Sequence, residues 1–361
     1  MCLILTSFQI DDCRDLSSLF YMLPFQKGYL VNWDHQKRIW DYVFSKNCLT
    51  VDTSHKSLVF TEPYFNFSSI QEGLSELFFE EYRFKNVFRT NPADLACYKR
   101  RLEAPQHPCC LVVDCGYSFT HIVPFVNGVR LKKAVRRLDI GGKLLTNHLK
   151  EIISYRQLHV MDETYVMNAC REDCCYVSMD YDADMASAAL RNSPENAVGR
   201  DYVLPDFTSL RRGYMKSRDE SSGHPASESE QIVRMNNERF TVPEILFNPS
   251  DIGIHQMGIP EAVAAVIAEC PEETHRWLFA NIVLVGGVAR TPNFAERVER
   301  DVRELAPAQY EVGVTLPKDP AGYAWEGGAK LAGDPVMKEI CVSRAEYQEH
   351  GHQACLDKYY L

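Results

Sequence analysis

Two segments of the sequence share one plan, a short and mostly apolar run that leads through a glycine-containing turn toward a helix. The first run is Cys109–Asp114, and its turn contains Gly116. The second run is Ile282–Val285, and Gly286–Gly287 follows it directly. Continuous apolar strands that alternate with helices are typical of a sheet covered on both faces. The two segments therefore predict an α/β core with a glycine turn at the end of each strand.

Further elements are predicted on both sides of these turns. Asn127–Gly128 favours a hairpin turn between two strands, and Gly141–Gly142 opens a helix. Thr291 is expected to cap a later helix that starts at Pro292. The predicted buried stripes of these two helices are Leu145, Leu149, Ile152 and Ile153, and Phe294, Val298, Val302 and Leu305. Upstream, helices are expected at 32–44 and 69–82, with a strand at 58–61.

The charge balance limits the partners that this chain can have. Its 361 residues carry 39 Lys and Arg against 49 Asp and Glu, a formal net charge of −10. A general phosphate-binding surface needs concentrated cations. The run Arg130–Arg137 is a local basic exception, which we interpret as the solvated side of a strand rather than a nucleic-acid contact. Partners are therefore expected to be proteins, with chromatin contacted only indirectly.

The cysteines and apolar runs predict an intracellular protein. Thirteen cysteines, an odd number, are scattered without a disulfide pattern. No run is long enough for a membrane span, and none resembles a signal peptide, so no membrane contact is expected. The tail His350–Cys355 could hold a metal, but a solvent-exposed polar tail is the preferred interpretation.

Two polar stretches are expected to lie outside the core. Lys216–Glu230 has no periodicity and predicts a flexible loop or a contact that orders on binding. Asp182–Asp201 is predicted to be a second surface insertion.

The glycine turns are also the best candidates for chemistry. The turn in Asp114–His121 can aim several backbone N–H groups at one anion, and Asp114 could hold a divalent cation through water. A plain hairpin is the alternative. At Gly286–Gly287 a ligand could approach the backbone closely, whereas the alternative is a tight connection. Two such turns in one α/β chain favour a nucleotide cleft.

Longer motifs resemble the actin family. Asp114–His121 is similar to its second phosphate loop, and Val285–Gly287 to its adenosine-side glycine turn. Similar segments run in the actin order from about Gln9 to the C-terminus, among them Asp139–Thr146, Gly28–Asp34 and Trp325–Gly328. Leu23–Asp34, Thr61–Phe67, Gly141–Glu163, Val242–Gly253 and Tyr323–Gly328 resemble the actin-related protein 6 subfamily in particular.

The resemblance implies an actin-like fold of two α/β lobes around a nucleotide cleft. The first lobe is expected to contain 1–104 and 322–361, and the second 105–321, with an inserted subdomain at about 143–230. The implied ligand is ATP or ADP with Mg²⁺, with Asp114 facing the metal through water. Gly116 would face the phosphates, and the ribose and adenine side would be lined by Gly142, Arg171, Glu172, Gly286 and Gly287.

Departures from the family pattern argue against hydrolysis. His121 matches a histidine near the attacking water. The activating glutamine of the family is not found: it should fall around Asn91 or Pro92, and neither residue can orient water as glutamine does. Tyr117 stands at an acidic position of the phosphate loop. The hairpin with the first phosphate loop has no counterpart in Met1–Leu23, which suggests a truncated isoform or an imperfect gene model. No catalytic residue is therefore predicted, and any nucleotide would have a structural role.

The function implied by the resemblance is that of a non-catalytic subunit in a Swr-type chromatin-remodelling complex, which exchanges a variant histone into nucleosomes. The implied partners are an insertion of the motor ATPase and a zinc-finger subunit. The expected location is the nucleus, with a cytoplasmic or cytoskeletal pool as an addition. The alternatives are an actin-like ATPase and a cytoskeletal filament protein.

Overall fold

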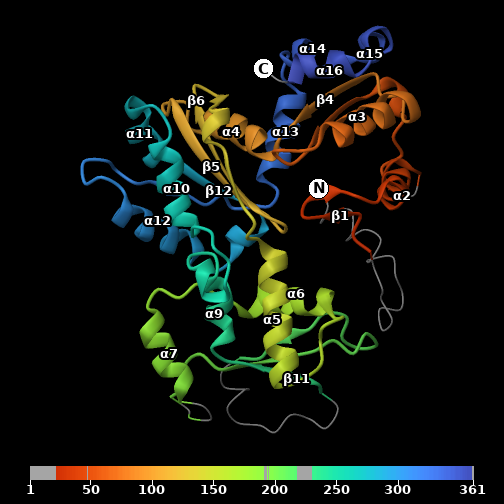
Figure 1. Ribbon diagram of the computed structural model, residues 1–361. Coiled ribbons are helices and arrows are strands. Elements are labelled where there is room, and N and C mark those ends of the chain that lie inside the picture. Colours follow the sequence, from red (N-terminus) through yellow and green to blue (C-terminus); the bar gives the residue numbers. More distant parts are fainter. Residues whose placement is uncertain (1–21, 47, 191–192, 194, 218–229, 360–361) are drawn as a thin grey trace. The chain divides into compact units, whose positions relative to one another are not determined.

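The computed structural model describes residues 22–46, 48–190, 193, 195–217 and 230–359. Its contacts divide the chain into two compact units (Figure 1). Among the described residues, the first unit holds those up to Gln106 and those from Gly322 onward, and the second is His107–Ala321. The prediction about a missing hairpin concerns Met1–Leu23, of which all but the last two residues lie outside the described ranges.

The second unit is built on a mixed sheet with the strand order β13-β12-β5-β6-β7, in which β8 also pairs with β6. The strands β5 and β12 are parallel neighbours, while β5 and β6 form an antiparallel hairpin. Both strand runs predicted from the sequence are confirmed. The strands of this sheet are β5 (Cys109–Cys115), β6 (Thr120–Val126), β7 (Val129–Arg130), β8 (Arg136–Leu138), β12 (Ile282–Val285) and β13 (Val314–Thr315).

Helices of the second unit share one apolar core with this sheet. Leu111 on β5, Leu284 on β12, Leu145 on α5 and Val298 on α12 are all fully buried in one cluster. The helices are α5 (Gly142–Arg156), α6 (Thr164–Cys174), α7 (Tyr181–Ala189), α9 (Glu238–Glu244), α10 (Ile259–Ala268), α11 (Glu272–Phe279) and α12 (Phe294–Leu305), with short turns η3 (Lys132–Ala134), η4 (Pro249–Ile252) and η5 (Gly287–Arg290). A smaller sheet has the order β10-β9-β11, from β9 (Arg200–Val203), β10 (Tyr214–Met215) and β11 (Ile232–Met235).

The first unit contains a three-stranded sheet with the order β14-β4-β3, in which β3 and β4 are parallel. Aromatic side chains dominate its core, with Trp40 and Phe78 rings 5.1 Å apart. Its elements are β1 (Phe25–Gln26), β2 (Tyr29–Leu30), α2 (Trp33–Phe44), η1 (Thr53–His55), β3 (Ser57–Thr61), α3 (Ser68–Glu76), η2 (Leu77–Glu81), β4 (Asn86–Thr90), α4 (Pro92–Glu103), α13 (Tyr323–Ala332), α14 (Met337–Ile340), β14 (Val342–Ser343), α15 (Arg344–His350) and α16 (His352–Tyr359).

The predicted hairpin turn at Asn127–Gly128 is confirmed. Asn127 and Gly128 both have positive φ, 51° and 81°, as a tight two-residue hairpin turn requires. The basic run is partly neutralised, because Arg136 pairs with Glu269 and Arg137 pairs with Asp139. The run is not the side of a single strand, because Arg130 ends β7, η3 covers Lys132–Ala134 and Arg136 begins β8.

Three further local predictions are wrong. The helix α12 starts at Phe294 rather than Pro292, because Asn293 adopts a left-handed backbone conformation with φ of 64°. Thr291 Oγ1 does not cap α12 and instead donates to Val288 O in the preceding turn η5. Its last predicted core residue, Leu305, is 48% exposed. The tail is not a solvent-exposed polar segment either. Cys355 in α16 is only 1% exposed, because it packs in the aromatic core of the first unit.

Among its described residues, the predicted surface insertion Asp182–Asp201 is largely exposed over α7 and is exposed at Glu195 and Ala197. Its end departs from the prediction, because Val198 is buried and Asp201 in β9 is buried with its carboxylate 2.8 Å from Arg234 Nε. None of the helices in the described ranges combines the length and the apolar content needed to cross a lipid bilayer.

Candidate functional site

The two glycine turns of the second unit lie against each other at one edge of the sheet. Because β5 and β12 are parallel and Asp114 pairs with Val285, the turns that follow both strands leave the sheet at the same edge. A Cβ atom on Gly286 would lie 2.2 Å from the carbonyl oxygen of Cys115. Gly286 also has φ of +92°, which side chains rarely adopt. Gly286 is therefore required for the two turns to pack.

Gly287 stands in a different environment from its neighbour. A Cβ atom added to Gly287 would meet no heavy atom within 4 Å, and its φ is not positive. The fold itself therefore has room for a side chain here. The open space beside this backbone is what a ligand that approaches closely would need.

The first turn is fixed to the start of α5. Gly142 N donates to Gly116 O at 3.1 Å, and Lys143 N donates to Tyr117 O at 2.7 Å. A Cβ atom on Gly141 would lie 2.7 Å from Tyr117 O, so the helix could not come this close with a larger residue. The predicted opening of a helix at Gly141–Gly142 is confirmed, and it holds the turn in place.

Three further side chains converge on Gly142. A Cβ atom there would lie 3.3 Å from the Tyr117 ring, 3.5 Å from Val288 Cγ2 and 3.6 Å from Arg171 Nη2. Val288 follows the second glycine turn directly, and Arg171 comes from α6. The structure thus brings Gly116, Gly142, Arg171 and the Gly286 turn into one neighbourhood of the second unit.

Arg171 is buried and its guanidinium is held by hydrogen bonds. Its Nε donates to Thr146 Oγ1 at 3.0 Å, and its Nη2 donates to Asn168 Oδ1 at 3.3 Å. Glu172 Oε1 lies 3.4 Å from the same Nη2 and also accepts from Asn168 at 2.8 Å. The Glu172 side chain remains about half exposed. It is thus the acceptor in this group that a ligand hydroxyl could reach.

Asp114 and His121 face each other across the β5–β6 hairpin. Burial raises the pKa of the Asp114 carboxyl to about 6. Burial, assisted by the charge of Arg137, lowers the pKa of His121 to about 3. The imidazole is therefore neutral at pH 7. A carboxylate that is costly to ionise would be stabilised by a bound cation.

We expect the Asp114→Asn variant to be more stable than the parent at pH 7.5. The folded-state pKa of about 6 exceeds the ordinary value of 3.8. The unfolded chain therefore ionises first, and the parent loses stability as pH rises from about 4 to about 6. Asp114 is only half-buried, so water screens part of the penalty, and we expect a difference of about 1 to 3 kcal/mol.

Urea unfolding of both proteins at about pH 4 and about pH 7.5 measures this difference. The asparagine variant should gain stability over the parent only at the higher pH. An equal difference at both pH values would contradict the assigned pKa.

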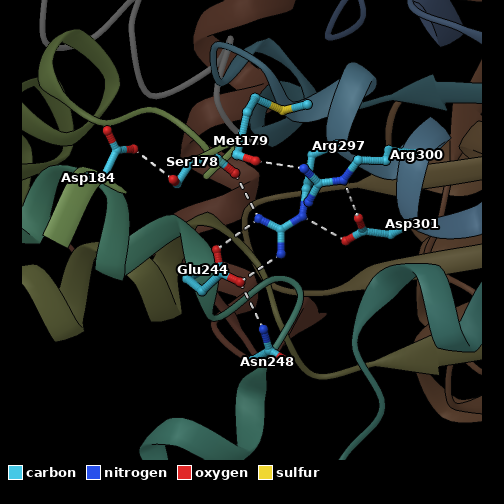
Figure 2. A network of polar contacts seen from close by, with 8 residues as sticks. All are labelled: Ser178, Met179, Asp184, Glu244, Asn248, Arg297, Arg300 and Asp301. Atoms are coloured by element: carbon cyan, nitrogen blue, oxygen red, sulfur yellow. Dashed lines mark hydrogen bonds and ion pairs between the residues drawn. The ribbon is translucent and has the colours of Figure 1, made fainter. Parts of the chain in front are cut away.

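A polar network that the sequence does not reveal joins α12 to α9 and to the segment that follows α6 (Figure 2). Arg297 of α12 donates from Nη2 to Glu244 Oε1 at 2.9 Å and from Nη1 to Ser178 O at 2.7 Å. Val177 N donates to Pro292 O at 2.9 Å, and Asn293 Nδ2 donates to Val177 O at 3.1 Å. The segment after α6 is thereby fixed to the segment after the second glycine turn. Of the contacts in this network, only the ion pair of Arg297 with Asp301 could be predicted from the sequence, because the two residues are four positions apart on one helix.

A metal ion at this site would need the phosphates of a bound nucleotide to complete its coordination. In the described part of the chain, no group of three or more His, Cys, Asp or Glu is placed to hold a metal ion. Asp114 alone offers a carboxylate at the strand end. Mg²⁺ usually takes one or two carboxylates together with substrate phosphates, and such an arrangement fits the residues present.

Comparison with known proteins identifies the fold. A family model described as Actin matches residues 7–359. The chain belongs to the actin family. It is 47% identical over 352 residues to Actin-related protein 6 of Drosophila melanogaster, an alignment that covers 96% of this chain and 87% of the fly protein. It is 41% identical to Actin-like protein ARP6 of Cryptococcus neoformans, covering 97% and 76%. It is 36% identical to Actin-related protein 6 of Oryza sativa subsp. japonica, covering 99% and 90%.

These similarities place the chain with the actin-related protein 6 subfamily, as its motifs predict. The predicted actin-like α/β fold is likewise confirmed. All seven residues predicted to contact nucleotide, from Asp114 to Gly287, lie in the second unit of this actin-related protein. Their contact with a ligand remains a prediction.

Proposed function

We propose that this actin-related protein is a non-catalytic structural subunit of a Swr-type chromatin-remodelling complex, which exchanges a variant histone into nucleosomes. The similarity to actin-related protein 6 over nearly the whole chain supports the assignment to a subfamily. The observation that carries the non-catalytic role is the hydrogen bond of Asn91, the residue near which the family's activating glutamine is expected. The side-chain amide of Asn91 donates from Nδ2 to the backbone oxygen of Glu62 at 2.8 Å, so this N–H group bonds the protein's own backbone and not a water molecule.

The same geometry supports nucleotide binding without turnover. ATP or ADP with Mg²⁺ would use the backbone of Gly116 and the open side of Gly287, and Glu172 would accept from a ribose hydroxyl. Asp114 would face the metal through water. His121 is neutral and only 1% exposed, which makes it a poor acceptor for a proton from solvent. We expect no appreciable ATP hydrolysis by the purified chain.

The proposed location is the nucleus, with an additional cytoplasmic or cytoskeletal pool. The proposed partners are an insertion of the motor ATPase and a zinc-finger subunit, so that chromatin is reached through other proteins. The test is affinity purification of the full chain from nuclear extract, followed by mass spectrometry. Co-purification of a remodelling ATPase and a zinc-finger subunit is expected. Recovery with cytoplasmic filaments and never with chromatin factors would overturn the assignment.

A second prediction concerns Lys216–Glu230, most of which lies outside the described residues. Lys216 Nζ and Glu230 Oε2 are 2.7 Å apart, so the two ends of this segment meet. Replacing residues 218–229 by a short glycine-serine linker should therefore leave the fold intact. We expect weaker recovery of the remodelling ATPase with an almost unchanged thermal unfolding midpoint. Unaltered recovery would retire the claim for this loop alone.

A further inference from the structure

The helix α7 presents apolar side chains to solvent instead of burying a face. Ala188 is its only buried residue. Tyr181 is 36% exposed and Met185 is 39% exposed, and the two lie four residues apart on one side of the helix. Met179, just before the helix, is 39% exposed as well. Figure 1 shows α7 in light green at the margin of the second unit. Together these three side chains make a small apolar surface on one helix.

The helix is held by its ends. A nine-residue helix is marginal on its own in water, yet here Ser178 Oγ donates to Asp184 at 2.6 Å and Asp180 caps the first turn. Arg300 Nη1 donates to Met179 O at 2.6 Å, next to the Arg297 contact with Ser178 (Figure 2). At the other end, Asn236 Nδ2 donates to Ala188 O at 2.9 Å.

These contacts fix α7 without covering it. The ring of Tyr181 packs edge-on against the fully buried Phe240, at 5.4 Å between centroids. Because α7 is already held in place, less conformational entropy is lost when a partner binds to it. The exposed apolar side chains are therefore presented in a fixed arrangement.

The helix α7 itself carries only acidic charge. Carboxylates occur at Asp180, Asp182 and Asp184, and no Lys or Arg lies between 180 and 190. The cation at its start, Arg300, is paired with Asp301. Burial together with the nearby charges of Glu244, Asp251 and Asp182 raises the pKa of Tyr181. Glu244 is neutralised by Arg297. Asp182 and Asp251 are exposed, and in the described part of the chain neither has an ion-pair partner.

We propose that the α7 face, formed by Met179, Tyr181, Asp182 and Met185, docks a cationic amphipathic helix of a partner protein. This inference rests on the proposed function as a subunit and gives it a contact surface. The apolar side of such a helix would cover the methionines. A Lys or Arg of the partner would lie over Tyr181 and pair with Asp182.

The charge excludes the other simple occupants. A second copy of this chain would bring two α7 faces of the same negative charge together, because a twofold contact uses the same patch on both copies. An acidic partner would meet like charge, which is costly across an interface. A cationic partner is the one whose charge matches the face.

The test uses a fluorescently labelled amphipathic helix of about 18 residues made of Leu and Lys, long enough to be helical. Fluorescence anisotropy measures its affinity for the purified full chain at physiological salt. The Asp182→Lys/Met185→Gln double variant should weaken binding about tenfold. A matched double variant changes Glu76, exposed on α3, to Lys and Met161, 38% exposed, to Gln. It should bind like the parent, and a Leu and Glu peptide of the same pattern should not bind.

Equal affinity of the two double variants for the cationic peptide would overturn the α7 face. All four substitutions lie on the surface, so thermal unfolding should stay unchanged and keep the comparison valid. The same variants are then carried through the nuclear purification. If the parent recovers the remodelling ATPase and the α7 variant recovers it equally well, the face is not the contact. If even the parent recovers no chromatin factor, the proposed function fails while the peptide result still decides the face.

Discussion

Replacing Gly287 by valine should abolish nucleotide binding and leave thermal unfolding almost unchanged. A Cβ atom at this position meets nothing within 4 Å, so the fold accommodates the side chain. A branched side chain would fill the space in which a ligand must approach the backbone. We expect the affinity for a fluorescent ATP analogue to fall at least about 100-fold, or about 2.8 kcal/mol. Titration of the analogue with Mg²⁺ against the parent and the variant measures this loss.

The neighbouring glycine supplies the matched control. Gly286→Ala places a Cβ atom 2.2 Å from Cys115 O at a backbone φ of +92°. This variant should therefore lose stability as well as binding, since the two turns can no longer pack. If Gly287→Val bound the analogue as well as the parent, the second glycine turn would not be part of a nucleotide site.

The second large effect is expected at Arg297, where alanine should reduce the free energy of unfolding by about 3 to 5 kcal/mol. Glu244 and Arg297 are both largely buried, with side-chain exposures of 6% and 11%. Removal of the guanidinium would leave the Glu244 carboxylate buried without its cation. Chemical denaturation of the parent and the variant gives the difference directly.

Arg300→Ala is the control for this prediction. Its side chain is 41% exposed, and its pair with Asp301 lies near the surface. The loss should be below about 1 kcal/mol. The Glu244→Ala/Arg297→Ala double variant should be less destabilised than the sum of the two single variants, because no charge is left unpaired. Strict additivity would show that the two side chains do not stabilise each other.

The sequence predicts β5 and β12 of the second unit well, because both are apolar except for Asp114 and each is followed by a glycine. The position of the helix after β12 could not be predicted as well. Thr291 and Pro292 form a strong local start signal, but Asn293 adopts a left-handed backbone conformation with φ of 64°, so α12 begins only at Phe294. Tertiary contacts outweigh the local preference there. Cys355 illustrates the same limit, because a polar sequence around one small apolar residue gives little sign of burial.

The glycines of the candidate site could be predicted from the sequence, whereas the side chains around them could not be predicted as well. Gly116 and Gly286 can be read from turns after apolar strands, whereas Arg171 and Glu172 follow only from resemblance to the actin family. The Glu244–Arg297 pair joins residues 53 positions apart, and no periodic pattern connects them. Such long-range ion pairs depend on how the helices pack, which the local sequence does not determine.

The place of β5 in the sheet has a consequence for synthesis on the ribosome. β5 lies between β6, which follows it at once, and β12, which begins only at Ile282. A nascent chain can thus close the β5–β6 hairpin early, while the other edge of an apolar strand waits for a segment made much later. Open apolar edges attract other chains. Ribosomes that stall before Ile282 should therefore release fragments that need a chaperone, and the two glycine turns can first meet only when nearly the whole protein has been made.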